Sequence, residues 1–402
     1  MTAPVDTASM QDLRDRMVAD LAEHGWITSE PVRDALSTLP REAFLPTAPL
    51  EKVYAPNDVV VTKTDQDGRT ISCTTAPWLI AAGLERSRIR RGDTILEIGT
   101  ALGINAGYLG LLTGPAGQVV SVEFDGEFID DSRTALDAVG ITNVEVIHAD
   151  GEFGAAHRAP YDVVIATVQT ADLPAAWLDQ VAESGRIVAA VRLRGLVRLF
   201  VFEREDDHWV ATSQLLCGFV SMQGLGARPQ QLVTVRAEVE LRVDGAQVDA
   251  GTVTALLESE AVQEWTGVTV GNAEPVLPHM DLYLATVLDD FGRFHATRDA
   301  ADDGRIPWTL GIGHSATWCE GGFAVVALRR LDERRHELGA WGYGPQGARL
   351  AAQMSGHIRD WDARHRGGPE PAVRAYRAGT PDDTLARGRI VDRTHARFTI
   401  TF

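Results

Sequence analysis

Acidic and glycine residues follow three consecutive apolar segments in the first half of the chain. They are Glu97, Gly99, Ala101 and Gly103 after the first segment, Glu123 after the second, and Asp150 and Gly151 after the third. Glycine lets the backbone approach a ligand closely, because a Cβ would collide with it. The second carboxylate can accept hydrogen bonds from both hydroxyls of a ribose, and the third from an adenine amino group. The pattern predicts a site for an adenosine-containing cofactor.

The loop between Gly99 and Gly103 departs from the dinucleotide fingerprint. That fingerprint, GxGxxG, places a helix N-terminus against a pyrophosphate. Here Glu97 stands two residues before the loop, and a carboxylate there repels a pyrophosphate but suits a cation. S-adenosyl-L-methionine carries a sulfonium and an ammonium and has no phosphate, so we expect it rather than NAD. The alternative is that the glycine turn and the acids serve only the fold. Ala101, a methyl where glycine is usual, either narrows the pocket or only packs.

Strands and helices alternate around these residues. The expected strands are 93–99, 117–124, 144–148, 161–167 and 185–191, and the expected helices are 101–112, 125–138 and 173–182. This alternation is typical of βαβ units, which build a doubly wound parallel sheet. We therefore predict an α/β fold with a Rossmann-like, S-adenosylmethionine-dependent methyltransferase domain.

The chain divides into three expected parts. Residues 1–80 hold amphipathic helices and a loop, 81–230 form the Rossmann-like core, and a polar, glycine-containing stretch near 222–231 marks a boundary. After this boundary, the pattern of residues 231–402 predicts an α+β extension. We expect this extension either to bind a peptide or to form the interface of a homodimer.

Composition narrows the classes of partner. The chain has 402 residues, 45% of them apolar, and a formal net charge of −18. A nucleic acid or an anionic membrane surface would need a basic face, so neither is expected as a partner. Cys73, Cys217 and Cys319 are too far apart for a zinc ribbon or a disulfide framework, and no histidine has metal-ligand spacing. We expect no metal, no signal peptide, no transmembrane helix, and a cytoplasmic setting.

Several segments resemble the protein-L-isoaspartate (D-aspartate) O-methyltransferase family. Residues 40–46 are similar to its PR-x-x-F-x-P segment, 70–77 to its active-site loop, 96–106 to its glycine motif, and 159–178 to its fourth strand and following helix. The resemblance spans roughly residues 10–205. It implies carboxyl methylation with S-adenosyl-L-methionine, and it adds Thr167, at the end of the fourth strand, to the expected cofactor residues.

The resemblance also identifies candidate catalytic hydroxyls. Thr75 stands at the position of the family's active-site serine, counted back from Pro77, and Ser72 and Thr74 are the nearest substitutes. A carboxylate is ionised at neutral pH and needs alignment rather than a strong base. The Thr75 hydroxyl can donate to one carboxylate oxygen and direct the other at the methyl group. Its alternative role is to cap a helix that starts at Pro77. Cys73 lacks the partners of a catalytic nucleophile.

The second half is similar to the extension of actinobacterial methyltransferases found beside ribosomally made peptide natural products. Residues 218–224 and 341–345 carry this similarity. It implies that an aspartate of a modified precursor peptide is methylated and that the ester then cyclises to an aspartimide. The alternatives are a general isoaspartate repair enzyme and, in another class, a degenerate peptide-binding scaffold. The long second half favours peptide tailoring, and we expect residues beyond 231 to hold the peptide.

Overall fold

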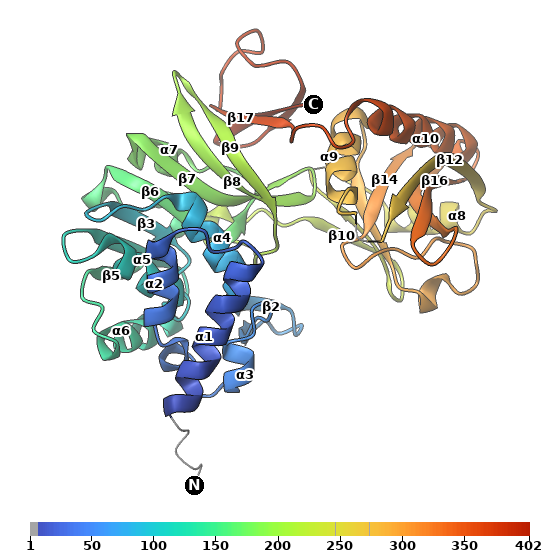
Figure 1. Ribbon diagram of the computed structural model, residues 1–402. Helices are drawn as coiled ribbons and strands as arrows, with labels where there is room; N and C mark the ends of the chain where they lie inside the picture. The colour runs from blue at the N-terminus through green and yellow to red at the C-terminus, as the bar shows by residue number, and fades with distance from the viewer. Residues whose placement is uncertain (1–6, 246, 273) are drawn as a thin grey trace.

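Two β-sheets dominate the computed structural model, which describes residues 7–245, 247–272 and 274–402 (Figure 1). One sheet has ten strands and the other seven, and a two-stranded hairpin stands apart from both. The α/β class with an additional C-terminal α+β part, expected from the sequence, is confirmed.

The ten-stranded sheet contains the parallel core predicted from the alternating pattern. Its order is β18-β19-β17-β9-β8-β7-β6-β3-β4-β5, and the neighbours from β7 to β5 run parallel. The parallel strands are β3 (Thr94–Ile98), β4 (Gln118–Glu123), β5 (Val144–His148), β6 (Tyr161–Thr170) and β7 (Val181–Leu193). Near-continuous apolar residues in these strands fit burial on both faces.

Five helices cover one face of this sheet with a shared core. They are α1 (Thr7–Glu23), α2 (Glu30–Thr38), α4 (Pro77–Ser87), α5 (Ile104–Thr113) and α6 (Ile129–Ala138). Leu21, Leu36 and Tyr108 are fully buried there. Two short turns, η1 (Arg41–Phe44) and α3 (Leu50–Val53), lead into the hairpin of β1 (Val61–Thr64) and β2 (Thr70–Cys73).

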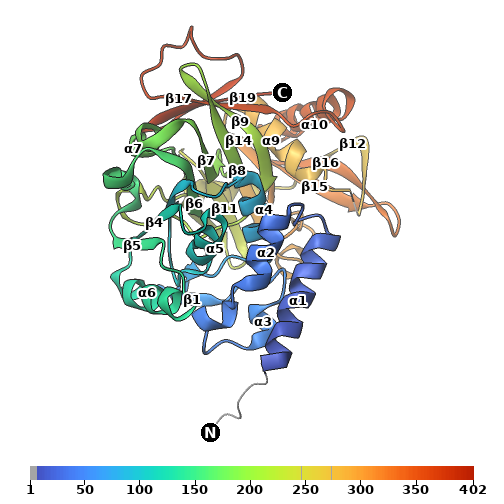
Figure 2. The ribbon, with the colours of Figure 1, turned by 60° about the vertical axis from the view of Figure 1, so that its left-hand side comes forward.

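The opposite face packs against α7 (Ala175–Gln180), and strands from the far C-terminus extend the sheet and share the core on this side. The antiparallel strands β8 (Leu196–Glu205) and β9 (His208–Leu216) extend the sheet, and β17 (Ala372–Arg377), β18 (Arg389–Asp392) and β19 (Ala396–Thr401) complete it (Figure 2). Fully buried Val373, Ala375 and Phe398 belong to the core that also contains Trp177 and Phe202. Burial of these apolar side chains explains why the last strands join the first sheet.

The sheet topology therefore differs from the expected division at residue 231. Residues 372–401 belong to the ten-stranded sheet rather than to a contiguous C-terminal unit. The expectation of one contiguous extension over 231–402 is therefore wrong for its last strands, since the sequence pattern did not reveal which sheet they join.

The seven-stranded sheet forms a second lobe that is antiparallel throughout. Its order is β10-β11-β13-β14-β15-β16-β12. The strands are β10 (Gln231–Arg236), β11 (Val239–Val243), β12 (Val262–Gly271), β13 (Gly292–Ala296), β14 (His314–Cys319), β15 (Gly322–Arg330) and β16 (Arg335–Tyr343). The helices of the lobe are α8 (Ala250–Leu257), α9 (Leu277–Val287) and α10 (Gly347–Arg364), and α10 packs on β12, β15 and β16 (Figure 1).

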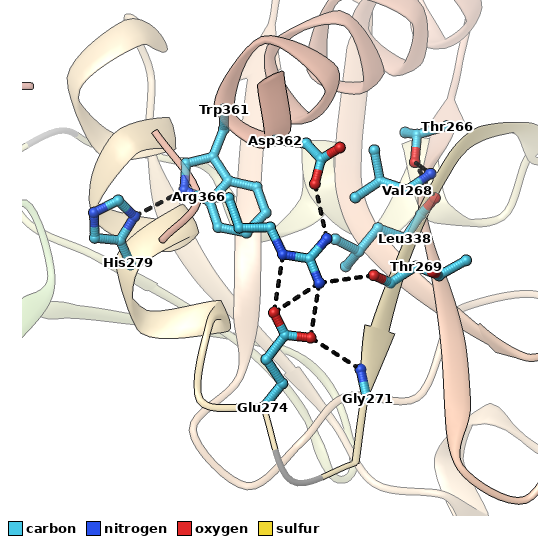
Figure 3. A network of polar contacts seen from close by, with 10 residues as sticks. All are labelled: Thr266, Val268, Thr269, Gly271, Glu274, His279, Leu338, Trp361, Asp362 and Arg366. Carbon is cyan, nitrogen blue, oxygen red and sulfur yellow. Dashed lines mark hydrogen bonds and ion pairs between the residues drawn. The ribbon is translucent and has the colours of Figure 1, made fainter. Parts of the chain in front are cut away.

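Polar contacts at the end of α10 join the elements of this lobe (Figure 3). The Arg366 guanidinium contacts Glu274 Oε1 at 2.7 Å and Asp362 Oδ1 at 2.8 Å. Trp361 Nε1 donates to His279 Nδ1 of α9 at 2.8 Å. These charge-assisted bonds secure the helix against β12 and α9.

Buried Asp244, just after β11, links the two sheets. Its carboxylate contacts Arg192 Nε of β7 at 3.4 Å and Arg393 Nη2 at 2.6 Å. The two halves are thus tied by a charged contact as well as by the shared strands. Of the described helices, none is both long and apolar enough to cross a membrane.

Candidate active site

A cleft of about 850 Å³, partly open to solvent, lies at the carboxyl ends of the parallel strands. Its lining comes from residues 71–75, 98–102, 104–105, 122–124, 167–168 and 220–223, together with Ile80, Phe128 and Gly151; the predicted residue Gly103 is not part of it and faces Ser132 and Leu136 instead. The carboxyl edge of a parallel sheet is where such folds bind ligands. Most of the residues predicted from the sequence therefore meet in one cleft.

The glycine loop requires its unusual backbone. Gly99 and Gly103 have φ of 96° and 92°. A Cβ on Gly99 would lie 2.8 Å from Thr167 Oγ1 and 2.9 Å from Val168 Cγ1, so only glycine fits there. Ala101 adopts φ of 45°, a left-handed conformation that costs a non-glycine residue roughly 1–2 kcal/mol. Its methyl group lines the cleft, so it occupies ligand space as well as packing.

Glu123 presents its carboxylate to the cleft at the end of β4. It is 7% exposed, and burial raises its pKa. Oε2 accepts from Ala101 N at 2.7 Å, and Oε1 accepts from Asp125 N at 2.8 Å. Each oxygen keeps further acceptor capacity for a ligand hydroxyl. Among the described residues that line the cleft, Glu123 is the only charged one.

Glu97 lies beneath the loop instead of in the cleft wall. It is fully buried, and its two oxygens accept from Asn105 Nδ2 at 2.8 Å and Ser121 Oγ at 2.5 Å. Burial raises its pKa to about 7. The structure thus places Glu97 where it anchors the loop to α5 and β4. From this position Glu97 does not reach the cleft, so the direct contact with a cationic ligand that we expected from the sequence is not supported.

Asp150 likewise supports the cleft from outside its lining. Its carboxylate accepts from Glu152 N at 3.0 Å and Leu225 N at 2.7 Å. Gly151 does line the cleft, and a Cβ there would lie 2.6 Å from Ile98 Cγ2. Trp177 is fully buried and donates to the Gly151 carbonyl at 2.8 Å, which makes it a core residue.

The three candidate hydroxyls differ in their engagement. Thr62 Oγ1 donates to Ser72 Oγ at 2.7 Å, and Val60 N donates to Thr74 Oγ1 at 3.0 Å. Thr75 lines the cleft, and among the described residues its hydroxyl has no hydrogen-bond partner. Ala76 is the N-cap of α4, so Thr75 does not cap that helix. Of the three hydroxyls, that of Thr75 is therefore the one without a bond in the described chain, whereas Ser72 Oγ and Thr74 Oγ1 each accept one bond and keep a hydrogen to donate.

Sequence reasoning assigned no site role to two elements that complete the cleft. Residues 220–223 form one wall, held by Gln169, whose N donates to Val220 O at 2.8 Å and whose carbonyl accepts from Met222 N at 2.9 Å. Lys63 of the hairpin contacts Asp125 at 2.5 Å and Glu127 at 2.8 Å, which ties the hairpin beside the cleft. The similarity of residues 218–224 to the peptide-tailoring subgroup was the available signal for the wall at 220–223. The sequence offered no signal for the role of Lys63.

Cys73 also lines the cleft, and burial raises the pKa of its thiol. A thiol with a raised pKa is a poor nucleophile at neutral pH. In the described ranges no cluster of three or more His, Cys, Asp or Glu side chains could hold a metal ion.

The donor set of the cleft fits S-adenosylmethionine. The described lining offers one carboxylate and no lysine or arginine, a charge that disfavours an anionic pyrophosphate and suits a cationic cofactor. Together with the doubly wound sheet, this defines the class: a Rossmann-like methyltransferase. The particular family follows from comparison: the model of the protein-L-isoaspartate (D-aspartate) O-methyltransferase family matches residues 12–226, and the chain belongs to that family. It is thus a carboxyl methyltransferase that uses S-adenosyl-L-methionine, as expected from the sequence.

Curated relatives named protein-L-isoaspartate O-methyltransferase match the first half of the chain. The protein from Methanothermobacter thermautotrophicus is 35% identical over 182 residues, which is 45% of this chain and 81% of the relative. The one from Koribacter versatilis is 33% identical over 224 residues, 56% of this chain and 96% of the relative. The one from Thermotoga maritima is 31% identical over 215 residues, 53% of this chain and 66% of the relative.

A solved structure of the same name aligns with both halves. It covers 90% of this chain and 96% of its own, with a TM-score of 0.51 and 22% identity. This likeness shows the fold alone.

Proposed function

We propose that the chain methylates the free α-carboxylate of isoaspartyl residues in peptides or proteins. The observation that carries the proposal is the cleft itself, which combines the single carboxylate of Glu123 with the free hydroxyl of Thr75. The relatives' names support isoaspartate as the acceptor.

Several residues would hold the cofactor. Glu123 would accept hydrogen bonds from the ribose hydroxyls, and the backbone of Gly99 and Ala101 would lie against the nucleoside. Gly151 would leave room for the adenine, and Thr167, whose hydroxyl donates to Ile98 O at 3.0 Å, would hold the loop in place. Glu97 and Asp150 would act as positioning residues, because their carboxylates hold the glycine loop and residue 225.

The chemistry needs alignment rather than a strong base. When bound, S-adenosylmethionine supplies the methyl group: a carboxylate oxygen forms the O–CH3 bond while the S–CH3 bond breaks and sulfur keeps the electron pair. Thr75 Oγ1 would donate to the other carboxylate oxygen and so orient the nucleophile. Ser72 and Thr74 are less suited to this role, because both residues are buried, whereas Thr75 is partly exposed; each of their hydroxyls also accepts a bond within the protein, although it keeps a hydrogen to donate.

The test compares two peptides of identical sequence, one with isoaspartate and one with aspartate. Incubation with S-adenosylmethionine is followed by mass spectrometry of the peptides and by measurement of base-labile methyl groups. We expect methyl esters on the isoaspartyl peptide only. Failure to methylate either peptide, with cofactor binding retained, would contradict the proposal and favour a peptide-binding scaffold.

A narrower candidate is the tailoring of an aspartate in a ribosomally made peptide, followed by aspartimide formation. One observation favours it: residues 220–223, within the stretch similar to the peptide-tailoring subgroup, line the cleft. The ester would lose methanol as the next backbone nitrogen attacks its carbonyl carbon and closes a five-membered ring. Methylation and ring closure on an aspartyl precursor peptide, with no activity on isoaspartyl peptides, would favour this candidate over repair.

A further inference from the structure

A small side chamber lies next to the cleft, beside Thr75. It comprises about 290 Å³, including space open to solvent, and shares Thr75, Ile80, Asn105 and Thr167 with the lining of the main cleft. The shared residues mark the side on which the two spaces meet. The chamber is therefore within reach of a molecule whose reacting carboxylate lies at the Thr75 hydroxyl.

The interior of the chamber is apolar. Leu79, Ile165 and Leu199 are 4%, 4% and 2% exposed, and Ala166 and Phe219 complete the lining. No charged residue belongs to the described lining. The polar lining residues, Thr75, Asn105 and Thr167, lie on the side shared with the main cleft, so a charged group placed against the apolar residues would lose hydration there without an ionic partner.

Gly83 keeps the floor of the chamber open. It lies in the middle of α4 and is buried, yet no atom lies within 4 Å of the position that a Cβ would take. Glycine inside a helix destabilises it by roughly 0.5–1 kcal/mol relative to alanine. Neither close packing nor a positive φ explains why residue 83 is glycine. The open space that the missing side chain leaves in the chamber is the remaining explanation.

We propose that this chamber is a substrate subsite that takes a small aliphatic side chain from a residue next to the methylated one. The proposal rests on the proposed function. The residue before an isoaspartate is joined to it by an ordinary peptide bond, so the two Cα atoms are about 3.8 Å apart and the side chain of that neighbour reaches the chamber when the carboxylate meets Thr75. Burial of a few methyl groups there favours peptides with such a neighbour.

The test uses isoaspartyl peptides that differ only in having valine or glycine on both sides of the isoaspartate. For the wild-type chain we expect kcat/KM for the valine peptide to exceed that for the glycine peptide about tenfold, as two buried carbon groups would give. Gly83→Leu places a side chain in the chamber and should reduce this ratio to about one. Gly83→Ala should give an intermediate ratio.

Gly356→Leu is the matched control. Gly356 also lies inside a helix, α10, with nothing within 4 Å of its Cβ position, but it is outside the cleft. Its substitution should leave the ratio unchanged. Thermal denaturation and calorimetric titration with S-adenosylhomocysteine establish that the variants fold and bind. If Gly83→Leu does not fold, the kcat/KM ratios of the wild type and of Gly83→Ala for the two peptides test the proposal.

The outcomes separate the subsite from the proposed function. A ratio near one in the wild type, or a tenfold ratio that Gly83→Leu leaves unchanged, overturns the subsite while the methyltransferase activity stands. No transfer to either peptide contradicts the proposed function, and the subsite fails with it.

Discussion

Replacement of Glu123 by alanine should weaken cofactor binding without unfolding the chain. In the structure the carboxylate holds Ala101 N and Asp125 N at 2.7 and 2.8 Å and faces the cleft. A hydrogen bond to a charged group contributes about 1.5–3 kcal/mol, so its loss to the ribose corresponds to roughly a ten- to hundredfold rise in Kd. Glu123→Gln keeps one acceptor oxygen and should fall between alanine and the wild type.

The assay is isothermal titration of each variant with S-adenosylhomocysteine. Asp130→Asn, in a side chain that is 97% exposed on α6, is the matched control and should bind as the wild type does. Burial raises the pKa of Glu123, so wild-type affinity should also fall as the pH drops through that pKa, and Glu123→Gln should lose this dependence. An unchanged Kd in Glu123→Ala would refute the assignment of the ribose to this carboxylate.

Four further predictions follow from the same contacts. Thr75→Ala should lower the methylation rate more than cofactor affinity, whereas Thr75→Ser should largely preserve the rate; equal losses would indicate packing. Burial raises the folded-state pKa of Glu97 to about 7 from its ordinary value of 4.5. The contribution of Glu97 to the free energy of unfolding should therefore be greatest below pH 4.5 and fall by about 3 kcal/mol as the pH rises to 7. In denaturant titrations, Glu97→Gln should remove this dependence of the free energy of unfolding on pH. Ala101→Gly should relieve the left-handed strain and raise the stability by up to about 1 kcal/mol, unless the freer unfolded chain cancels the gain. A chain that ends at residue 230 should fail to fold, because it loses 372–401 from the first sheet; a cooperative melting transition in that fragment would contradict this.

The local pattern of the first half was sufficient to predict the parallel sheet and the position of the cleft. Gly99 and Glu123 stand at the ends of their own strands. Because the carboxyl ends of parallel strands meet at one edge of the sheet, their positions along the chain predict that they lie at the cleft. The direction of a side chain is a different matter. Glu97 turns under the loop to meet Asn105 and Ser121, and this depends on partners that no spacing discloses.

Contacts between distant parts of the chain account for the rest. The strands at 372–401 pair with β9 because they complete an apolar core, and their own sequence reads equally well as part of a separate domain. The wall at 220–223 depends on a backbone pairing with Gln169. Such strand pairings depend on the tertiary packing of the chain rather than on local secondary-structure propensity.

A crystal structure with S-adenosylhomocysteine and an isoaspartyl peptide would test the central claim most directly. The account predicts that both ribose hydroxyls lie within hydrogen-bond distance of the Glu123 carboxylate, and that one oxygen of the isoaspartyl carboxylate accepts from Thr75 Oγ1 while the other faces the sulfur. A nucleoside bound away from Glu123, or a peptide carboxylate that contacts Ser72 or Thr74 and not Thr75, would contradict it.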